Sequence, residues 1–409
     1  MNHTWHIITG EYPPQMGGVS DYTEQLAIGL ASEGDKVHVW CPDFKSDSAN
    51  NHAVETHRIA GLFSPAKLLE LGRLLNSFEA PRTLLVQYAP NAFGLRGLNI
   101  FICLWLLSRS LFSRDDVRVM FHEPFFYFAR QSLRRNLLAA VNRLMAALLM
   151  AASRIVYVSI PAWEPMLRRY DWFRRAPVKW LPIPSTIPRV EDDEAVETIR
   201  RRYATDESKL IIGHFGTYGE RAKDDLAPIL AELLKRRRDL LALCIGARGD
   251  SFAAELICEH PEFQSRVFAP GLLSREAVSL HLQACDLAIQ PYPDGASSRR
   301  TSLMAPLANG VPVITTSGEL SEPLWSESRA VPLAVSGDTA SAVALAITMI
   351  EDNALRKKVG ETGMDFYAEH FSLDRSLDKL LERVLKCGSD LIAARLAGDS
   401  IKPTSSDVG

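Results

Sequence analysis

A pair of glycines stands where the first predicted strand gives way to the first predicted helix. The apolar run WHIIT (residues 5–9) leads into GEYPPQMGGVSDY (residues 10–22). Gly17 and Gly18 would let the backbone turn tightly and approach a ligand with no Cβ in the way. The amides of the helix that follows would attract an anion. The same pair could simply connect a strand to a helix, so it is a candidate phosphate loop.

A second candidate anion site lies in DGASSRRTSLMAPLANG, residues 294–310. Arg299 and Arg300 precede a predicted helix, and guanidinium groups are the strongest side-chain partners of phosphate oxygens. Three hydroxyls could cap that helix or bond a diphosphate, namely those of Ser297, Ser298 and Ser302. The alternative is a solvated basic loop, but two arginines in a Ser- and Gly-rich loop favour phosphate binding.

Polar residues also end two of the predicted strands. Gln87 and Tyr88 close RTLLVQY, and His122 and Glu123 follow VRVMF. Residues at the carboxyl ends of parallel strands face the ligand crevice of an open α/β sheet. A lone histidine at a strand end is more often a hydrogen-bonded core residue, and Tyr88 could equally belong to the core.

The elements that must position these residues form two similar halves. Apolar runs at residues 6–9, 36–41, 82–88, 117–124 and 154–160 predict strands, and amphipathic patterns predict helices at 22–33, 66–76, 98–112, 132–152 and 162–169. The rhythm restarts at KLIIGHFG, residues 209–216. Continuously apolar strands alternating with helices indicate parallel sheets covered on both faces. The predicted fold class is therefore α/β, with two Rossmann-like doubly wound domains facing across a cleft.

The predicted boundaries are an N-terminal Rossmann-like domain at 1–185, a proline- and acid-rich linker at 186–208 and a C-terminal Rossmann-like domain at 209–352. Helices at 353–390 would pack back on the N-terminal domain, and 391–409 would be a disordered tail.

Composition excludes several classes of protein. The chain has 409 residues and a net charge of −3, which argues against nucleic-acid binding. Residues 1–185 carry 20 Lys and Arg against 15 Asp and Glu, so the basic surface belongs to the first half. Six scattered cysteines without a CxxC pair indicate free thiols in a reducing compartment. The apolar segment 98–112 is too short to span a bilayer.

Several motifs together resemble the retaining GT-B glycosyltransferases of the family 4 type. EYPPQMGGVSDYTEQLAIGLASEGDKVHVWCP resembles the N-terminal signature of that family, and FHEPF its histidine segment. RVFAPGLLSREAVSLHLQACDLAIQPYPDG and LANGVPVITT resemble the second-domain run and the strand entry that follows the donor loop. The resemblance covers about residues 5–370.

This resemblance implies transfer of a sugar from a nucleoside-diphosphate sugar to a glycan or lipid-linked acceptor. It implies that the domain at 1–185 binds the acceptor and that the domain at 209–352 binds the nucleotide sugar. It implies retention, no metal or other cofactor, and a setting in surface polysaccharide or glycolipid assembly. The negative charge that develops on the departing diphosphate must be stabilised by positively charged side chains and backbone amides. Asp115-Asp116 is not placed as a metal clamp and is expected at the surface.

The resemblance also suggests site roles. His122 would contact the transferred sugar, Asp294 would face its hydroxyls, and Arg299 would act as the phosphate electrophile. Residues expected to bind the donor phosphates or nucleotide are Gly17, Gly18, Gly216, Thr217, Arg221, Lys223, Ser297, Ser298, Arg300 and Ser302. Residues expected to bind the acceptor are Tyr12, Gln87, Tyr88 and Glu123.

The sequence departs from the family at two places. The exit Gly216-Thr217-Tyr218 lacks the usual first arginine, for which Arg221 could substitute. Ala305 replaces the glutamate that usually holds the ribose, so ribose contacts are unassigned.

Other classes remain open. A nucleotide-sugar epimerase of the same architecture and a noncatalytic sugar-nucleotide-binding protein are the alternatives. A dinucleotide oxidoreductase is disfavoured because no GxGxxG follows the first strand. Two basic surfaces, one with Arg130, Arg134, Arg135 and Arg143 and one at residues 168–180 with Trp172, Phe173 and Trp180, could contact an anionic membrane. The expected location is the cytoplasm, including the inner face of the membrane.

Overall fold

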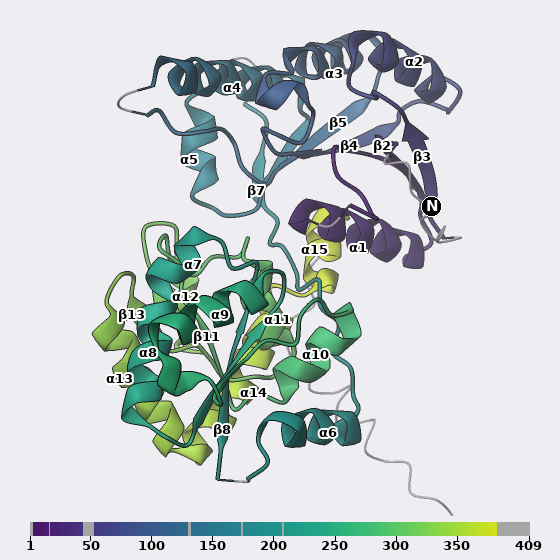
Figure 1. Cartoon of the computed structure of the whole chain (residues 1–409). Helices are drawn as coiled ribbons and strands as arrows, with labels where there is room; N and C mark the ends of the chain where they lie inside the picture. The colour runs from purple at the N-terminus through teal and green to yellow at the C-terminus, as the bar shows by residue number, and fades with distance from the viewer. Residues whose placement is uncertain are drawn as a thin grey trace, which may run out of the picture.

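The computed structural model describes residues 3–15, 17–43, 53–129, 132–172, 175–206 and 208–382. The predicted tail at 391–409 lies outside these residues. Two α/β domains lie one above the other and are joined by the segment that follows β7 (Figure 1). The predicted fold class is confirmed.

The N-terminal sheet has seven parallel strands in the order β3-β2-β1-β4-β5-β6-β7. The strands are β1 (Thr4–Thr9), β2 (Lys36–Pro42), β3 (Glu55–Ile59), β4 (Thr83–Tyr88), β5 (Asp116–Phe121), β6 (Ile155–Val158) and β7 (Val178–Trp180). The helices are α1 (Gly18–Ser32), α2 (Pro65–Leu75), α3 (Ile100–Phe112), α4 (Leu133–Ala152) and α5 (Trp163–Arg168), with a 3-10 turn at Leu95–Gly97. The sequence patterns missed β3 and β7, which are short edge strands rather than buried apolar runs.

The C-terminal sheet has six parallel strands in the order β10-β9-β8-β11-β12-β13. The strands are β8 (Leu210–Phe215), β9 (Leu240–Ile245), β10 (Val267–Phe268), β11 (Leu287–Gln290), β12 (Val313–Ser317) and β13 (Leu333–Val335). The helices are α6 (Asp193–Tyr203), α7 (Glu220–Asp225), α8 (Ala227–Arg236), α9 (Gly249–Glu259), α10 (Arg275–Gln283), α11 (Thr301–Ala308), α12 (Pro323–Ser328), α13 (Thr339–Glu351), α14 (Asn353–His370) and α15 (Leu373–Leu380), with a 3-10 turn at Pro261–Phe263. Part of the predicted linker thus forms α6, which packs on α10.

Apolar side chains cover both faces of each sheet. In the N-terminal domain α2, α3 and α4 cover one face, and α1 covers the other. The last helix, α15, lies beside α1 although it follows the C-terminal domain in sequence (Figure 1). Leu377 and Leu380 of α15 join the core around Tyr22 and Leu26, so burial of apolar surface holds the chain end on the first domain. The preceding helix α14 packs on α11 and α13 instead.

Asp115 and Asp116 are not surface residues, which corrects the sequence-based expectation. Asp115 accepts from Arg82 Nε at 2.6 Å and from Arg109 Nε at 2.5 Å, and its side chain is fully buried. Asp116 pairs with Arg118 at 2.9 Å. Sequence reasoning failed here because the two arginine partners of Asp115 lie on other elements, and buried carboxylates are rare unless paired.

Two polar junctions join the domains beside the cleft. Arg275, at the start of α10, contacts Asp21 and Glu24 of α1, each at 2.9 Å. At the second junction the Ser298 hydroxyl lies 2.8 Å from the Ser159 carbonyl oxygen and also contacts Glu322. These contacts fix the relative position of the two domains around the cavity described next.

Candidate active site

A cavity of about 390 Å³ lies between the two domains. Its walls come from the carboxyl ends of N-terminal strands and from the start of α11. The lining residues used below are Glu11, Gly18, His122, Glu123, Arg299 and Arg300. The size suits a small ligand, and the position matches the crevice expected for doubly wound sheets.

Two helices begin at this cavity, one from each domain. Gly18 is the first residue of α1 and Thr301 the first residue of α11, and both line the cavity. A Cβ at Gly18 would meet none of the described residues within 4 Å. The partial positive charge of both helix N-termini therefore faces the same space, where it would stabilise an anion.

Glu11 is a cavity residue that sequence reasoning missed. A Cβ at Gly17 would lie 3.0 Å from Glu11 Oε2, so the absence of a side chain at Gly17 makes room for this carboxylate. Burial raises the pKa of Glu11. Glu11 follows β1 by two residues, so the strand-end rule that singled out His122 could have found it.

Arg299 and Arg300 both lie against Asp294. Arg299 Nη2 donates to Asp294 Oδ2 and Arg300 Nη2 donates to Asp294 Oδ1. Arg299 Nη1 also lies 3.5 Å from Glu123 Oε1. Burial, followed by the charge of Arg300, lowers the pKa of Arg299. The two guanidinium groups share the Asp294 carboxylate, and Arg299 also faces Glu123, so two cationic and two anionic side chains meet beside the cavity.

His122 is a buried neutral imidazole. Its Nε2 lies 2.8 Å from Gln87 Oε1, and because an amide oxygen only accepts, the proton is on Nε2. Burial lowers the pKa of His122 to about 3. The ring also meets Tyr22 edge-on, with centroids 5.3 Å apart. Gln87 therefore contacts His122 and is fully buried.

The three serines near the start of α11, Ser297, Ser298 and Ser302, contact different neighbours. Ser297 and Ser298 are fully buried, and Ser298 belongs to the interdomain junction. Its backbone N–H donates to Glu322 Oε1 at 2.9 Å. Burial raises the pKa of Glu322. The Ser302 hydroxyl lies 2.7 Å from the Tyr292 hydroxyl.

The loop after β8 is folded against its own domain. Gly216 donates its N–H to Ile245 O at 3.1 Å, and Tyr218 is buried, with its hydroxyl donating to His214 O at 2.8 Å. Thr217 is exposed. Lys223 pairs with Glu255 of α9 at 2.5 Å. The side chain of Arg221 lies outside the described part of the chain.

Two of the expected acceptor residues are core residues. Tyr12 is buried in the core around α1, and burial raises its pKa to about 12. Tyr88 is fully buried against Phe93 and Phe121. Ala305 is likewise buried within α11. Among the expected acceptor residues, Glu123 therefore lines the cavity directly, and Gln87 reaches it through His122.

Comparisons with known proteins agree with this architecture. The model of Glycosyltransferase Family 4 matches residues 16–182. Sucrose-phosphate synthase from Thermosynechococcus elongatus has 15% identity, covers 97% of this chain and 100% of that chain, and superposes with a TM-score of 0.69. No curated protein sequence matches the chain.

Two further solved structures are similar over 93% of this chain. Anabaena HepE, in complex with UDP and glucose, has 13% identity, 99% coverage of that chain and a TM-score of 0.67. WaaG, a glycosyltransferase involved in lipopolysaccharide biosynthesis, has 14% identity, 100% coverage and a TM-score of 0.61. These likenesses show that the fold is of the GT-B type. The part of the chain that the Glycosyltransferase Family 4 model matches lies in the N-terminal domain.

Proposed function

We propose that the chain transfers a sugar from a nucleoside-diphosphate sugar to a glycan or lipid-linked acceptor with retention of configuration. The donor would bind the C-terminal domain and the acceptor the N-terminal domain. The observation that carries the proposal is the meeting of Arg299, Arg300 and two helix N-termini at one interdomain cavity. The comparisons do not favour the epimerase alternative.

Arg299 and Arg300 would hold the diphosphate. Both guanidinium groups bond Asp294, and Arg299 also lies 3.5 Å from Glu123, so a diphosphate would be a further anionic partner for them. The charge that develops on the leaving diphosphate would be stabilised in place by these groups and by the amides of α11. The protein itself supplies the positive charge, so the proposed transfer requires no metal.

Asp294 and His122 would orient the sugar. Asp294 is fixed by two arginines and keeps oxygen lone pairs for sugar hydroxyls. His122 Nδ1 remains an acceptor because Nε2 carries the proton. Glu11 and Glu123 would face the acceptor hydroxyl from the N-terminal side. The donor would also contact the backbone near two loops, at Gly17 and Gly18 and at Gly216 and Thr217. Ser298 would not bind the donor, because its hydroxyl contacts Ser159 and Glu322 at the interdomain junction.

A membrane setting is part of the proposal. Helix α4 is long and apolar enough to cross a membrane, but half of it is buried in the N-terminal domain, as in core helices of soluble proteins. The outer surface of α3 and α4 carries exposed apolar side chains, among them Phe112, Leu133 and Leu137, beside the exposed Arg134 and Arg135. Such a surface would suit the anionic cytoplasmic face of a membrane, where lipid-linked acceptors lie. Arg143 would contribute little, because it donates to the Phe126 and Ala139 carbonyl oxygens.

The first experiment is a thermal-shift screen with UDP, GDP, ADP and TDP. A ligand at about 100 times its Kd stabilises the native state by about 2.7 kcal/mol, which corresponds to a rise in Tm of about 5–10 °C for a domain of this size. One nucleotide should give this shift with the wild type and not with Arg299→Ala/Arg300→Ala.

The matched control is Arg201→Ala/Arg202→Ala, which removes an adjacent arginine pair from the exposed face of α6. This control should keep the full shift. A shift that survives in Arg299→Ala/Arg300→Ala would refute the assignment of the donor site to these arginines, and no shift with any nucleotide would refute the donor site altogether.

A further inference from the structure

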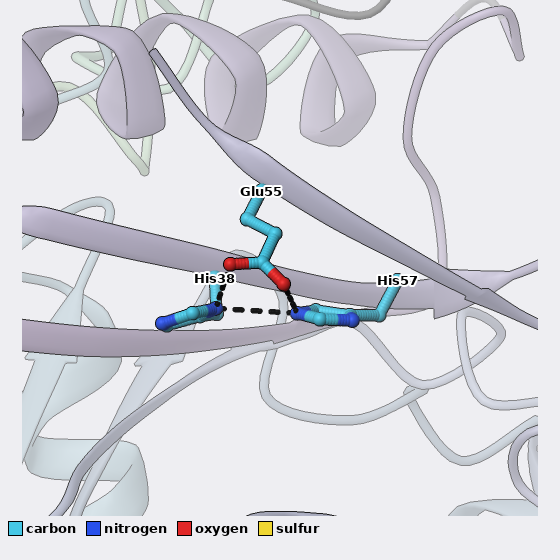
Figure 2. Close-up of side chains that lie close together, drawn as sticks. All are labelled: His38, Glu55 and His57. Atoms are coloured by element: carbon cyan, nitrogen blue, oxygen red, sulfur yellow. Dashed lines mark hydrogen bonds and ion pairs between the residues drawn. The ribbon is translucent and has the colours of Figure 1, made fainter. Parts of the chain in front are cut away.

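Two histidines and a glutamate converge on the N-terminal sheet, outside the interdomain cavity. His38 lies on β2, and Glu55 and His57 lie on the edge strand β3. His38 and Glu55 are direct partners in the parallel register. In Figure 2 the two imidazole nitrogens face each other, and the Glu55 carboxylate lies beside them with one oxygen toward each nitrogen.

We propose that His38, Glu55 and His57 bind one divalent transition-metal ion of the zinc type. The three ligand atoms would be His38 Nδ1, His57 Nε2 and a Glu55 carboxylate oxygen, which all lie within 4.8 Å of one another. Imidazole and carboxylate together suit zinc and its neighbours in the first transition series, whereas magnesium and calcium prefer oxygen ligands alone.

The spacing of the three ligand atoms fits the coordination sphere of such an ion. His38 Nδ1 lies 3.2 Å from His57 Nε2 and 3.2 Å from Glu55 Oε2, and His57 Nε2 lies 3.4 Å from Glu55 Oε1. Zinc bonds to nitrogen and oxygen of about 2.0–2.1 Å give ligand–ligand edges of about 3.3–3.4 Å in a tetrahedron. The edge between the two nitrogens is already near this length, and so is the distance from each nitrogen to its nearer Glu55 oxygen, Oε2 for His38 and Oε1 for His57.

Hydrogen bonding alone satisfies this arrangement poorly. If both facing nitrogens carried protons, the two N–H groups would point at each other across 3.2 Å. If only one of these nitrogens carried a proton, that N–H could donate well to one neighbour, either the facing nitrogen or a Glu55 oxygen. The nitrogen without a proton would then direct its lone pair at an acceptor oxygen or at the other nitrogen. A cation at the centre satisfies all three groups together.

Neighbouring aromatic rings hold the two imidazoles in orientation. The His57 ring stacks on Trp40 with centroids 3.9 Å apart and an interplanar angle of 11°. The His38 ring stacks on His6 at 5.0 Å and meets the edge of Phe78 at 4.6 Å. Ligands that packing already holds in place lose less freedom when the ion binds.

The ion would be structural and would remain open to solvent. Glu55 begins β3 and His38 is the third residue of β2, so the cluster lies toward the amino ends of the strands, while the cavity lies at their carboxyl ends. Side-chain exposure of 63% for Glu55 and 25% for His57 gives an ion access from water. Three protein ligands leave a fourth position to water. The bound ion would join edge strand β3 to β2.

The test is zinc titration of the full chain after removal of metal with a chelator. Calorimetry should show one Zn²⁺ per chain, and Tm should rise by about 5–10 °C at 100 times Kd. Glu55→Gln and His57→Ala should each weaken zinc binding at least about 100-fold, because even losing an outer-shell partner typically costs 10–100-fold. Mg²⁺ should cause no shift.

The matched control is His260→Ala. His260 pairs with Glu262 at 3.6 Å and has 24% side-chain exposure, close to that of His57, but among the described residues no third ligand joins this pair. It should bind zinc like the wild type. Circular dichroism and Tm in chelator show whether the variants fold, and Glu55→Gln, at an exposed position, preserves side-chain shape. No zinc binding by the wild type, or equal binding by Glu55→Gln and His57→Ala, would overturn the proposal.

The metal proposal stands apart from the proposed transfer. Loss of zinc binding would leave the nucleotide shift intact, and Arg299→Ala/Arg300→Ala would leave zinc binding intact.

Discussion

The neutral state of His122 makes the stability of this protein depend on pH in a way that can be calculated. Burial lowers the pKa of His122 from 6.5 to about 3. Between these values only the unfolded chain binds the proton, so the stability due to the neutral form is fully present above pH 6.5 and is lost as the pH falls toward 3. At 1.36 kcal/mol per pH unit, the loss at pH 5 is about 2 kcal/mol.

The variant His122→Gln removes this titration and keeps a side chain that can donate to Gln87. The free energy of unfolding in urea should be measured at pH 7 and pH 5 for both proteins. We expect the wild type to lose about 2 kcal/mol more than His122→Gln between the two pH values. Equal losses would refute the conclusion that His122 is held neutral, and with it the assignment of Nδ1 as an acceptor in the site.

Two other substitutions test the framework of the site. Asp115→Asn should lower the free energy of unfolding, measured in urea, by about 3–5 kcal/mol, because Arg82 and Arg109 would stay buried without their carboxylate. The control Glu197→Gln breaks the exposed pair with Arg201 and should cost less than about 1 kcal/mol. Similar losses in the two variants would contradict this reasoning. Gly246→Ala places a Cβ 2.2 Å from Gly216 O at φ +117°, so it should displace the loop after β8 and weaken nucleotide binding about tenfold in titration calorimetry, a strain of order 1–3 kcal/mol. Gly34→Ala has a comparable φ of +89° and open surroundings among the described residues, and it should leave nucleotide binding unchanged.

Local sequence patterns were sufficient for most of the fold. Helix 66–76 was predicted one residue from its observed bounds, Pro65–Leu75, and helix 132–152 one residue from Leu133–Ala152. In both helices the apolar residues recur with the helical period over the whole length, and this apolar face is the one that packs against the sheet. The first helix begins at Gly18, four residues before the predicted 22–33, because the glycine pair has no side chains that would mark the pattern. Strand β3 was missed because ETHRI is a polar edge strand, and the proposed metal ligands lie there.

Sequence alone determined the two-domain α/β class and pointed to the strand ends, because the spacing of apolar residues and the order of strands and helices can be read from local segments. It also predicted His122, Glu123, Arg299 and Arg300 as site residues, and all four line one cavity. Only the tertiary structure decided which side chains reach that cavity. Tyr12 and Tyr88 turn into cores, Ser298 joins the domains, and Glu11 enters the site. The side on which a residue is buried depends on packing partners from distant parts of the chain, and these contacts have no signature in the local pattern.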